Sequence, residues 1–217
     1  MGERVREGVT LNNHACLSTA LQENNLILTA QMQQQLEHYL ALLQKWNKVF
    51  NLTAICDPRE MVYLHIIDSL VISPYLHGSR MLDVGSGAGL PGLPLAILHP
   101  EQQWTLLDKS NKKTRFLTQA VIELDLPNVT VHNARCEEFH SEAGFDSIVS
   151  RAWSDLSTML ATIEHVIAPT GVFIAMKSAQ VATEIALLSP RFSVQAVQPL
   201  QIKGMAVERY VVILKVK

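Results

Sequence analysis

Apolar positions near the start of the chain recur at helical spacing. After Thr29 they fall every three or four residues, beginning with Met32 and ending with Trp46, which places them on one face of a helix. Thr29 is a residue type that caps helix N-termini. A second helix is predicted after Asp57, where a cap, a proline and an acid follow one another, and it should run to about Val71.

Beyond Gly78 the pattern changes to short apolar runs separated by helix-like stretches. The runs read RMLDVG, QWTLLD, VTVHNA, FDSIVSRA and GVFIAM. This alternation favours a parallel sheet with helices on both faces. Two last runs, FSVQAVQPL and ERYVVILKV, flank a turn at Lys203 and Gly204 and should pair antiparallel.

The predicted fold is therefore α/β and Rossmann-like, with a mostly parallel twisted sheet, a C-terminal antiparallel hairpin and an N-terminal helical extension. We expect the extension over residues 25–78 and the sheet domain over residues 79–217. Residues 1–24 match no predicted element, and we expect them to form a flexible tail.

Composition narrows the class of protein. The 217 residues are 48% hydrophobic and 18% charged, as in a globular chain with a large core. No apolar run reaches the ~20 residues of a membrane helix, so we expect a cytoplasmic protein without a membrane partner. The three cysteines lie far apart and the histidines lack H-x-x-x-H spacing, so we expect no metal site. A net charge of −2 confines any RNA contact to a local patch.

A glycine-rich loop follows the first strand, in the run LDVGSGAGLPG. In a doubly wound fold this is where a ligand binds. The loop follows Asp83 and contains Gly85, Gly87 and Gly89, a spacing that differs from the dinucleotide-binding fingerprint. It resembles instead the first motif of S-adenosylmethionine-dependent methyltransferases. A tight turn with a purely structural role remains the alternative.

Two further candidates follow the next strands. Asp108 ends the second strand about twenty residues beyond the loop, where an acid accepts hydrogen bonds from ribose hydroxyls; its alternative role is a helix cap. The run Arg135-Cys136-Glu137-Glu138 follows the third strand, where it would meet an adenine or form only a solvated charged turn.

Several runs together carry a family resemblance. LLQKWNKVFNLT, HIIDS, DVGSGAGLPGLPLAI, LLDKSNKKTRFL, FDSIVSRA and VVILKV resemble the glucose-inhibited division protein B family from about residue 25 to the end. These ribosomal small subunit methyltransferase G enzymes methylate N7 of one guanine in small-subunit ribosomal RNA. The resemblance implies S-adenosyl-L-methionine as cofactor, with contacts at Gly85, Leu90, Cys136, Glu137 and Arg151. It implies 16S rRNA or the small ribosomal subunit particle as partner, and we expect a monomer.

The residues after the fourth strand fit that chemistry. They read SRAW, without the D/N-P-P-Y/F motif of amino-group methylation, and no cysteine lies in the motif that C5 methylation of a pyrimidine requires. Guanine N7 offers a lone pair and has no proton to remove, so orientation carries most of the catalysis. A small molecule with a ready nucleophile would fit equally well.

The remaining candidates surround the expected reaction site. Arg151 is the catalytic candidate, since it can orient the cofactor and donate to guanine O6. Trp153 would stack on a base or pack in the core. His65 and Asp68 share a helical face and would close over the pocket or bond each other. Four basic residues would bind RNA phosphates or form a solvated helix face: Lys109, Lys112, Lys113 and Arg115.

Two other functions remain open from these residues alone. A small-molecule methyltransferase would keep the glycine loop but would not need the basic run. A nonenzymatic RNA-binding module would need the basic run but would have no use for Asp108 or the glycines. Binding of S-adenosylmethionine and transfer of its methyl group to RNA separate the three functions.

Overall fold

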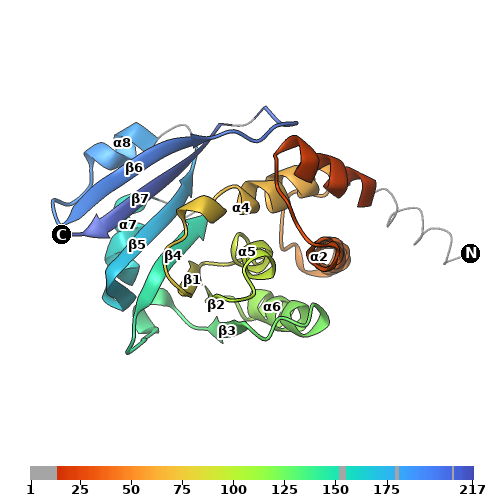
Figure 1. Cartoon of the computed structure of the whole chain (residues 1–217). Helices are drawn as coiled ribbons and strands as arrows, with labels where there is room; N and C mark the ends of the chain where they lie inside the picture. Colours follow the sequence, from red (N-terminus) through yellow and green to blue (C-terminus); the bar gives the residue numbers. More distant parts are fainter. Residues whose placement is uncertain (1–13, 152–154, 179–180, 207) are drawn as a thin grey trace, which may run out of the picture.

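A seven-stranded sheet forms the centre of the molecule, with strand order β3-β2-β1-β4-β5-β7-β6 (Figure 1). The structure is a computed structural model that describes residues 14–151, 155–178, 181–206 and 208–217. The strands are β1 (Arg80–Val84), β2 (Gln103–Asp108), β3 (Val129–Asn133), β4 (Phe145–Arg151), β5 (Ile167–Lys177), β6 (Phe192–Leu200) and β7 (Arg209–Val216). The strands β1 to β5 are parallel, and β7 runs antiparallel to both β5 and β6. The predicted parallel sheet and C-terminal hairpin are confirmed.

Helices cover both faces of the sheet. They are α2 (Ala30–Phe50), α3 (Pro58–Met61), α4 (Asp68–Leu70), α5 (Gly92–Leu98), α6 (Asn111–Glu123), α7 (Leu156–Ile163) and α8 (Val181–Ala186). In Figure 1, α2, α4, α5 and α6 lie on one side and α7 and α8 on the other. Alternate strand residues face alternate cores, so Met81 packs with the first group while Leu82 packs with α7. No helix among the described residues is long and apolar enough to cross a membrane.

The predicted N-terminal helices begin where their caps indicate. The backbone N–H of Met32 donates to Thr29 Oγ1 at 3.2 Å, and that of Glu60 donates to Asp57 Oδ1 at 2.9 Å. The second helix is not uniform, because a π-helical segment, η1 (Val62–Ile67), joins α3 to α4. The wider turn of a π-helix cannot be read from apolar spacing, so the sequence predicted only a continuous helix.

The expected flexible tail over residues 1–24 is wrong for its second half. Residues 14–23 are helical, and Leu17 and Leu21 are buried in the same core as α2. Asn24 then binds the turn of the C-terminal hairpin, where its Oδ1 accepts from the Lys203 N–H at 2.8 Å. The N-terminal helix is therefore held against the other end of the chain; residues 1–13 lie outside the described part.

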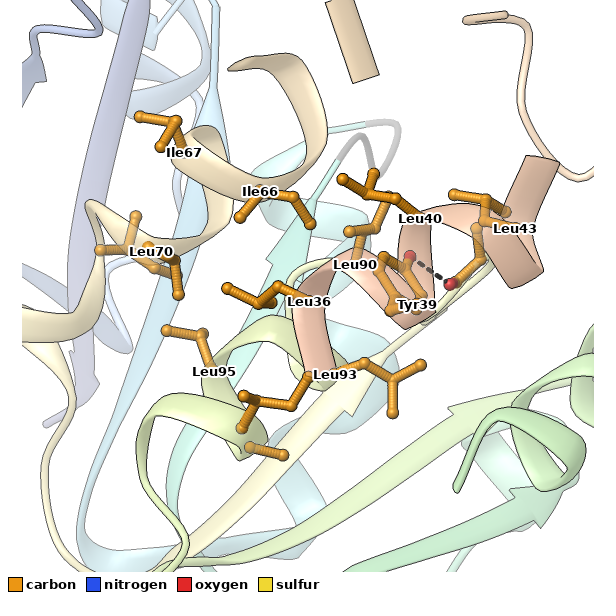
Figure 2. Close-up of a cluster of buried hydrophobic side chains, with 14 of the residues drawn as sticks. Leu36, Tyr39, Leu40, Leu43, Ile66, Ile67, Leu70, Leu90, Leu93 and Leu95 are labelled. Carbon is orange, nitrogen blue, oxygen red and sulfur yellow. Dashed lines mark hydrogen bonds between the residues drawn. The ribbon is translucent and has the colours of Figure 1, made fainter. Parts of the chain in front are cut away.

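Helix α2 packs directly on the glycine loop and α5. Figure 2 shows Leu36, Tyr39 and Leu40 of α2 against Leu90 and Leu93. The Tyr39 hydroxyl donates to the carbonyl of Ala88, within the loop, at 2.8 Å. Burial raises the pKa of the Tyr39 phenol, so it stays protonated and remains a donor. The helical extension thus shares a core with the sheet domain and fixes the loop from behind.

Candidate functional site

The glycine loop adopts a conformation that its glycines permit. Gly85, Gly87 and Gly89 have φ values of 69°, 59° and 89°, in the left-handed region that residues with a side chain rarely adopt. A Cβ atom on Gly89 would also lie 2.4 Å from Leu93 Cδ1. Leu90, which follows, turns its side chain into the core beneath the loop (Figure 2).

Asp83 lies under this loop and not in the open site. Its side chain is fully buried, and its Oδ2 accepts from the Gly92 N–H at the start of α5 at 2.9 Å. Burial raises the pKa of Asp83 to about 7, only partly offset by that bond. The side chain of Asp83 therefore occupies the N–H group at the start of α5 from within the protein.

Asp108, at the end of β2, holds the loop from the other side. Its Oδ2 accepts from the Gly87 N–H at 2.9 Å, and its Oδ1 accepts from the Ser110 N–H at 2.8 Å. Lys113 Nζ lies 3.8 Å from Oδ2. The N-cap position of α6 is Ser110, whose side chain makes no capping hydrogen bond, and Asp108 lies two residues before it. The carboxylate therefore joins the glycine loop to the start of α6 at the carboxyl edge of the sheet.

These elements surround a hollow of about 320 Å³, called here the cofactor hollow. Its lining includes most of the residues predicted to bind the cofactor or to lie beside it: Gly85, Asp108, Lys109, Lys113, Arg135, Cys136, Glu137 and Arg151. Burial raises the pKa of the Cys136 thiol to about 11, so this cysteine stays protonated and is a poor nucleophile. Of the predicted residues, Asp83, Gly87, Gly89 and Leu90 support the loop without lining the hollow.

Arg151 ends β4 and lies between this hollow and a second one. Its Nη1 donates to the Leu64 carbonyl at 2.8 Å and lies 3.3 Å from Asp68 Oδ2. In the π-helix, the Asp68 N–H bonds the carbonyl of Tyr63 instead of that of Leu64, its ordinary α-helical acceptor. The irregular helix thus gives Arg151 a backbone acceptor, and Asp68 neutralises its charge.

The second hollow, of about 410 Å³, is called here the acceptor hollow. Its lining combines the loop after α2, η1, the start of α4, the ends of β4 and β5 and the start of β7. The lining residues are Thr53, Ala54, Ile55, Leu64, His65, Asp68, Arg151, Met176, Lys177, Ser178 and Arg209. Burial and the positive charge of Arg151 lower the pKa of His65 to about 4, so His65 is neutral at physiological pH. Asp68 accepts from Arg209 Nε at 3.1 Å, and His65 Nε2 lies 3.1 Å from Thr53 Oγ1. His65 and Asp68 therefore do not bond each other, because each bonds other groups.

The basic run is divided between two surroundings. Lys109 and Lys113 line the cofactor hollow, whereas Lys112 and Arg115 are exposed on α6 outside it. Lys112 Nζ donates to the Phe50 carbonyl at the end of α2 at 3.0 Å. The run therefore extends from the cofactor hollow toward the N-terminal helices. Trp153 lies outside the described residues.

Sequence reasoning missed Arg209, Lys177 and Thr53. Arg209 and Lys177 are the polar ends of strands that were identified from their apolar residues, and polar strand ends at the carboxyl edge are the signal that was available. Thr53 lies in the WNKVFNLT run, quoted only for its resemblance. No group of three or more histidine, cysteine or acidic residues in the described part is placed to hold a metal ion.

Comparison with known proteins adds the family. The model of the rRNA small subunit methyltransferase G (GidB) family matches residues 32–212. The chain belongs to this family. It is 45% identical over 202 residues to the ribosomal RNA small subunit methyltransferase G of Vibrio cholerae, covering 93% of this chain and 96% of that one. The same enzyme of Shigella flexneri is 44% identical over 199 residues, with 92% and 96% covered.

Solved structures resemble the chain at the level of the fold. A SAM-dependent methyltransferase from Aquifex aeolicus superposes with a TM-score of 0.60 at 15% identity, covering 80% of this chain and 97% of that one. The glycopeptide N-methyltransferase MtfA in complex with S-adenosylmethionine gives a TM-score of 0.56 at 13% identity, with 71% and 96% covered. The family assignment excludes a nonenzymatic RNA-binding module.

Proposed function

We propose that the chain methylates N7 of one guanine in 16S ribosomal RNA at the junction of the two hollows. As a member of the GidB family it is an S-adenosylmethionine-dependent rRNA methyltransferase. The observation that carries the finer assignment is Arg151, which lines both hollows and is fixed by Leu64 and Asp68. A donor in one hollow and a base in the other would meet beside this guanidinium.

The cofactor hollow has groups that suit S-adenosylmethionine. A carboxylate has about four lone-pair positions, and Asp108 uses two of them within the protein, which leaves acceptors for ribose hydroxyls. Gly85 allows close approach of the backbone because it has no Cβ. Cys136 and Glu137, in a short 3₁₀ turn (Cys136–Glu138), would flank the adenine. The protonated thiol of Cys136 contributes shape and not reactivity.

The acceptor hollow suits a neutral planar base with a carbonyl oxygen. Arg151 can donate to guanine O6 through guanidinium hydrogens that its bonds to Leu64 and Asp68 leave available. Asp68 pairs with both Arg151 and Arg209, so its carboxylate offsets part of the positive charge in the hollow. His65 is neutral and adds no further charge.

The reaction requires the chain to orient the reactants but not to transfer a proton. S-adenosylmethionine supplies a methyl group on a positively charged sulfur, and guanine N7 accepts it through a lone pair without losing a proton. Arg151 and the neutral His65 therefore need only hold the base in line with the donor. A side chain that acts as a base is not required, and the protonated Cys136 does not act as a nucleophile.

This function also sets the partner and the place of action. The substrate is 16S rRNA, free or in a small ribosomal subunit particle, so the enzyme would act in the cytoplasm, where ribosomes assemble. We propose that one monomer suffices, because both hollows are lined by a single chain.

The product tests this proposal. A methyl group on N7 leaves a fixed positive charge that makes the guanine ring open to borohydride reduction and the strand open to aniline scission. Ribosomal RNA from cells that contain the protein should be cut at one guanine, and RNA from cells without it should not. Purified protein with S-adenosylmethionine should restore the cut. Mass spectrometry that identifies methyladenine or 5-methylcytosine instead would refute the N7 assignment.

A further inference from the structure

A third hollow lies beside the acceptor hollow and has no role in the function described so far. It measures about 760 Å³, lies between the end of α2 and the start of α3, and is called here the α2 hollow. Its lining is Gln44, Asn47, Lys48, Asn51, Thr53, Ala54, Cys56, Pro58 and Met61. Most of these residues belong to the WNKVFNLT run or adjoin it.

Thr53 and Ala54 line both the α2 hollow and the acceptor hollow. Thr53 is fixed from each side, because its backbone N–H donates to Asn47 Oδ1 at 2.9 Å while its Oγ1 lies 3.1 Å from His65 Nε2. Asn47 belongs to the α2 hollow and His65 to the acceptor hollow. Thr53 and Ala54 thus form the wall between the two spaces, and a ligand that fills one lies directly beside the other.

The lining of the α2 hollow combines the features that bind a nucleotide. Pro58, Met61 and Ala54 give an apolar surface for the face of a base. Gln44 and Asn51 present amides, which have both donors and acceptors for a base edge. Lys48 is an exposed cation of the kind that binds a phosphate. The side chains of Gln44, Lys48 and Asn51 form no hydrogen bond or ion pair with another described residue, so these groups are available.

We propose that the α2 hollow binds the nucleotide next to the target guanine in the RNA chain. This inference rests on the proposed function, because it needs a guanine in the acceptor hollow. Sequence-specific RNA recognition commonly uses unstacked bases that are splayed apart into separate pockets. Thr53 and Ala54 then form the wall between two neighbouring bases. Gln44 and Asn51 read the edge of the second base, and Lys48 binds the connecting backbone.

Cys56 offers a native probe of occupancy, because its exposed thiol lines the α2 hollow. Alkylation by iodoacetamide, followed peptide by peptide with mass spectrometry, should slow several-fold at Cys56 when small ribosomal subunits or their extracted rRNA, from cells lacking the protein, are added. S-adenosylmethionine alone should protect Cys136 and leave Cys56 unchanged. Cys16, in the N-terminal helix, serves as the internal reference.

A paired substitution tests whether the hollow reads the base. Asn51 has a φ of 49°, so Asn51→Gly removes the amide and keeps the backbone. Together with Gln44→Ala it should raise the KM for the rRNA substrate about tenfold, the effect of losing one or two hydrogen bonds, with the affinity for S-adenosylmethionine unchanged. Gln198→Ala, on the exposed surface of β6, is the matched control and should change neither.

The outcomes separate this inference from the proposed function. The nucleotide site in the α2 hollow would be overturned if the double variant methylates normally with an unchanged KM and RNA does not slow the alkylation of Cys56. The N7 assignment would then stay intact. Protection of Cys56 without a change in KM would also overturn the nucleotide site, since RNA would only cover the hollow. If the parent enzyme methylates neither the particle nor its rRNA, the proposed function itself fails.

Discussion

At the scale of single residues, Asp83 is a carboxyl group whose pKa the fold strongly raises. It is fully buried beneath the glycine loop, and its Oδ1 has no hydrogen-bond partner in the described part of the chain. The pKa of Asp83 is raised from 3.8 to about 7. In the folded protein this carboxyl therefore ionises near neutral pH, although in the unfolded chain it ionises near pH 4.

This shift makes the stability of the fold depend on pH. Because the folded pKa is raised, the contribution of Asp83 is fully present below about pH 4 and is lost as the pH rises through about 7. His65 acts oppositely: its lowered pKa costs stability as the pH falls from 6.5 toward 4. The two effects overlap in range, so the pH profile of the parent protein alone does not separate them.

The Asp83→Asn variant isolates the first effect. Asparagine keeps an oxygen for the Gly92 N–H and carries no charge, so the variant should gain stability over the parent as the pH rises from 5 to 7. The free energy of unfolding, from denaturant titrations of both proteins, should diverge by up to about 1.4 kcal/mol per pH unit. Parallel curves over that range would show that Asp83 ionises in the folded protein as it does in the unfolded chain.

Asp108 makes a different contribution, because its carboxylate retains two acceptor positions for a ligand. Asp108→Asn should weaken binding of S-adenosylmethionine by about 1 to 3 kcal/mol, the scale of hydrogen bonds to a charged group. Calorimetric titration measures this loss. Asn133→Ala is the control, since Asn133 bonds only the backbone carbonyl of Asp108. Unchanged affinity in a folded Asp108→Asn variant would leave Asp108 as a support of the loop and nothing more.

At the scale of helices and strands, the sequence predicted what local spacing encodes. The caps at Thr29 and Asp57 and the apolar runs of the strands act over a few residues, and the structure confirms them. The π-helix Val62–Ile67 escaped prediction because its wider turn cannot be read from apolar spacing; the Leu64 carbonyl in it bonds a distant side chain, Arg151. The burial of Leu17 was missed because it depends on a core that is shared with elements elsewhere in the chain.

The cofactor hollow and the acceptor hollow also differ in how far local sequence motifs predict their lining. The cofactor hollow is lined mainly by residues at or just after the ends of β1 to β4, where the sequence motifs lie. The acceptor hollow joins Thr53, Leu64, Arg151, Lys177 and Arg209, which no single motif contains. Only folding brings these residues together. Sequence reasoning named three residues of that lining, His65, Asp68 and Arg151, but not the space they share.

At the scale of the whole molecule, the net charge of −2 hides a local concentration of positive charge. Lys109 precedes α6, and Lys112, Lys113 and Arg115 lie in its first turns. The bond from Lys112 to the Phe50 carbonyl places this run beside the end of α2. Helix α2 contributes Lys45 and Lys48 there. An RNA strand that reaches the acceptor hollow and the α2 hollow would pass over this surface, and these side chains would neutralise its phosphates.

The dependence of RNA affinity on salt tests this surface. Lys113 is unsuitable for substitution because it lies near Asp108 and lines the cofactor hollow, whereas Lys112 and Arg115 do not line it. The double variant Lys112→Gln and Arg115→Gln should reduce the slope of log affinity against log salt by about 1.4 to 1.8, since each lost phosphate contact removes about 0.7 to 0.9. Affinity for S-adenosylmethionine should stay the same.

Lys215→Gln with Lys217→Gln is the control, because it removes the same charge at the end of β7. The salt slope of this control should match that of the parent. An unchanged slope in the α6 variant would make the basic run a solvated helix face, and the path of the RNA would then have to cross other elements.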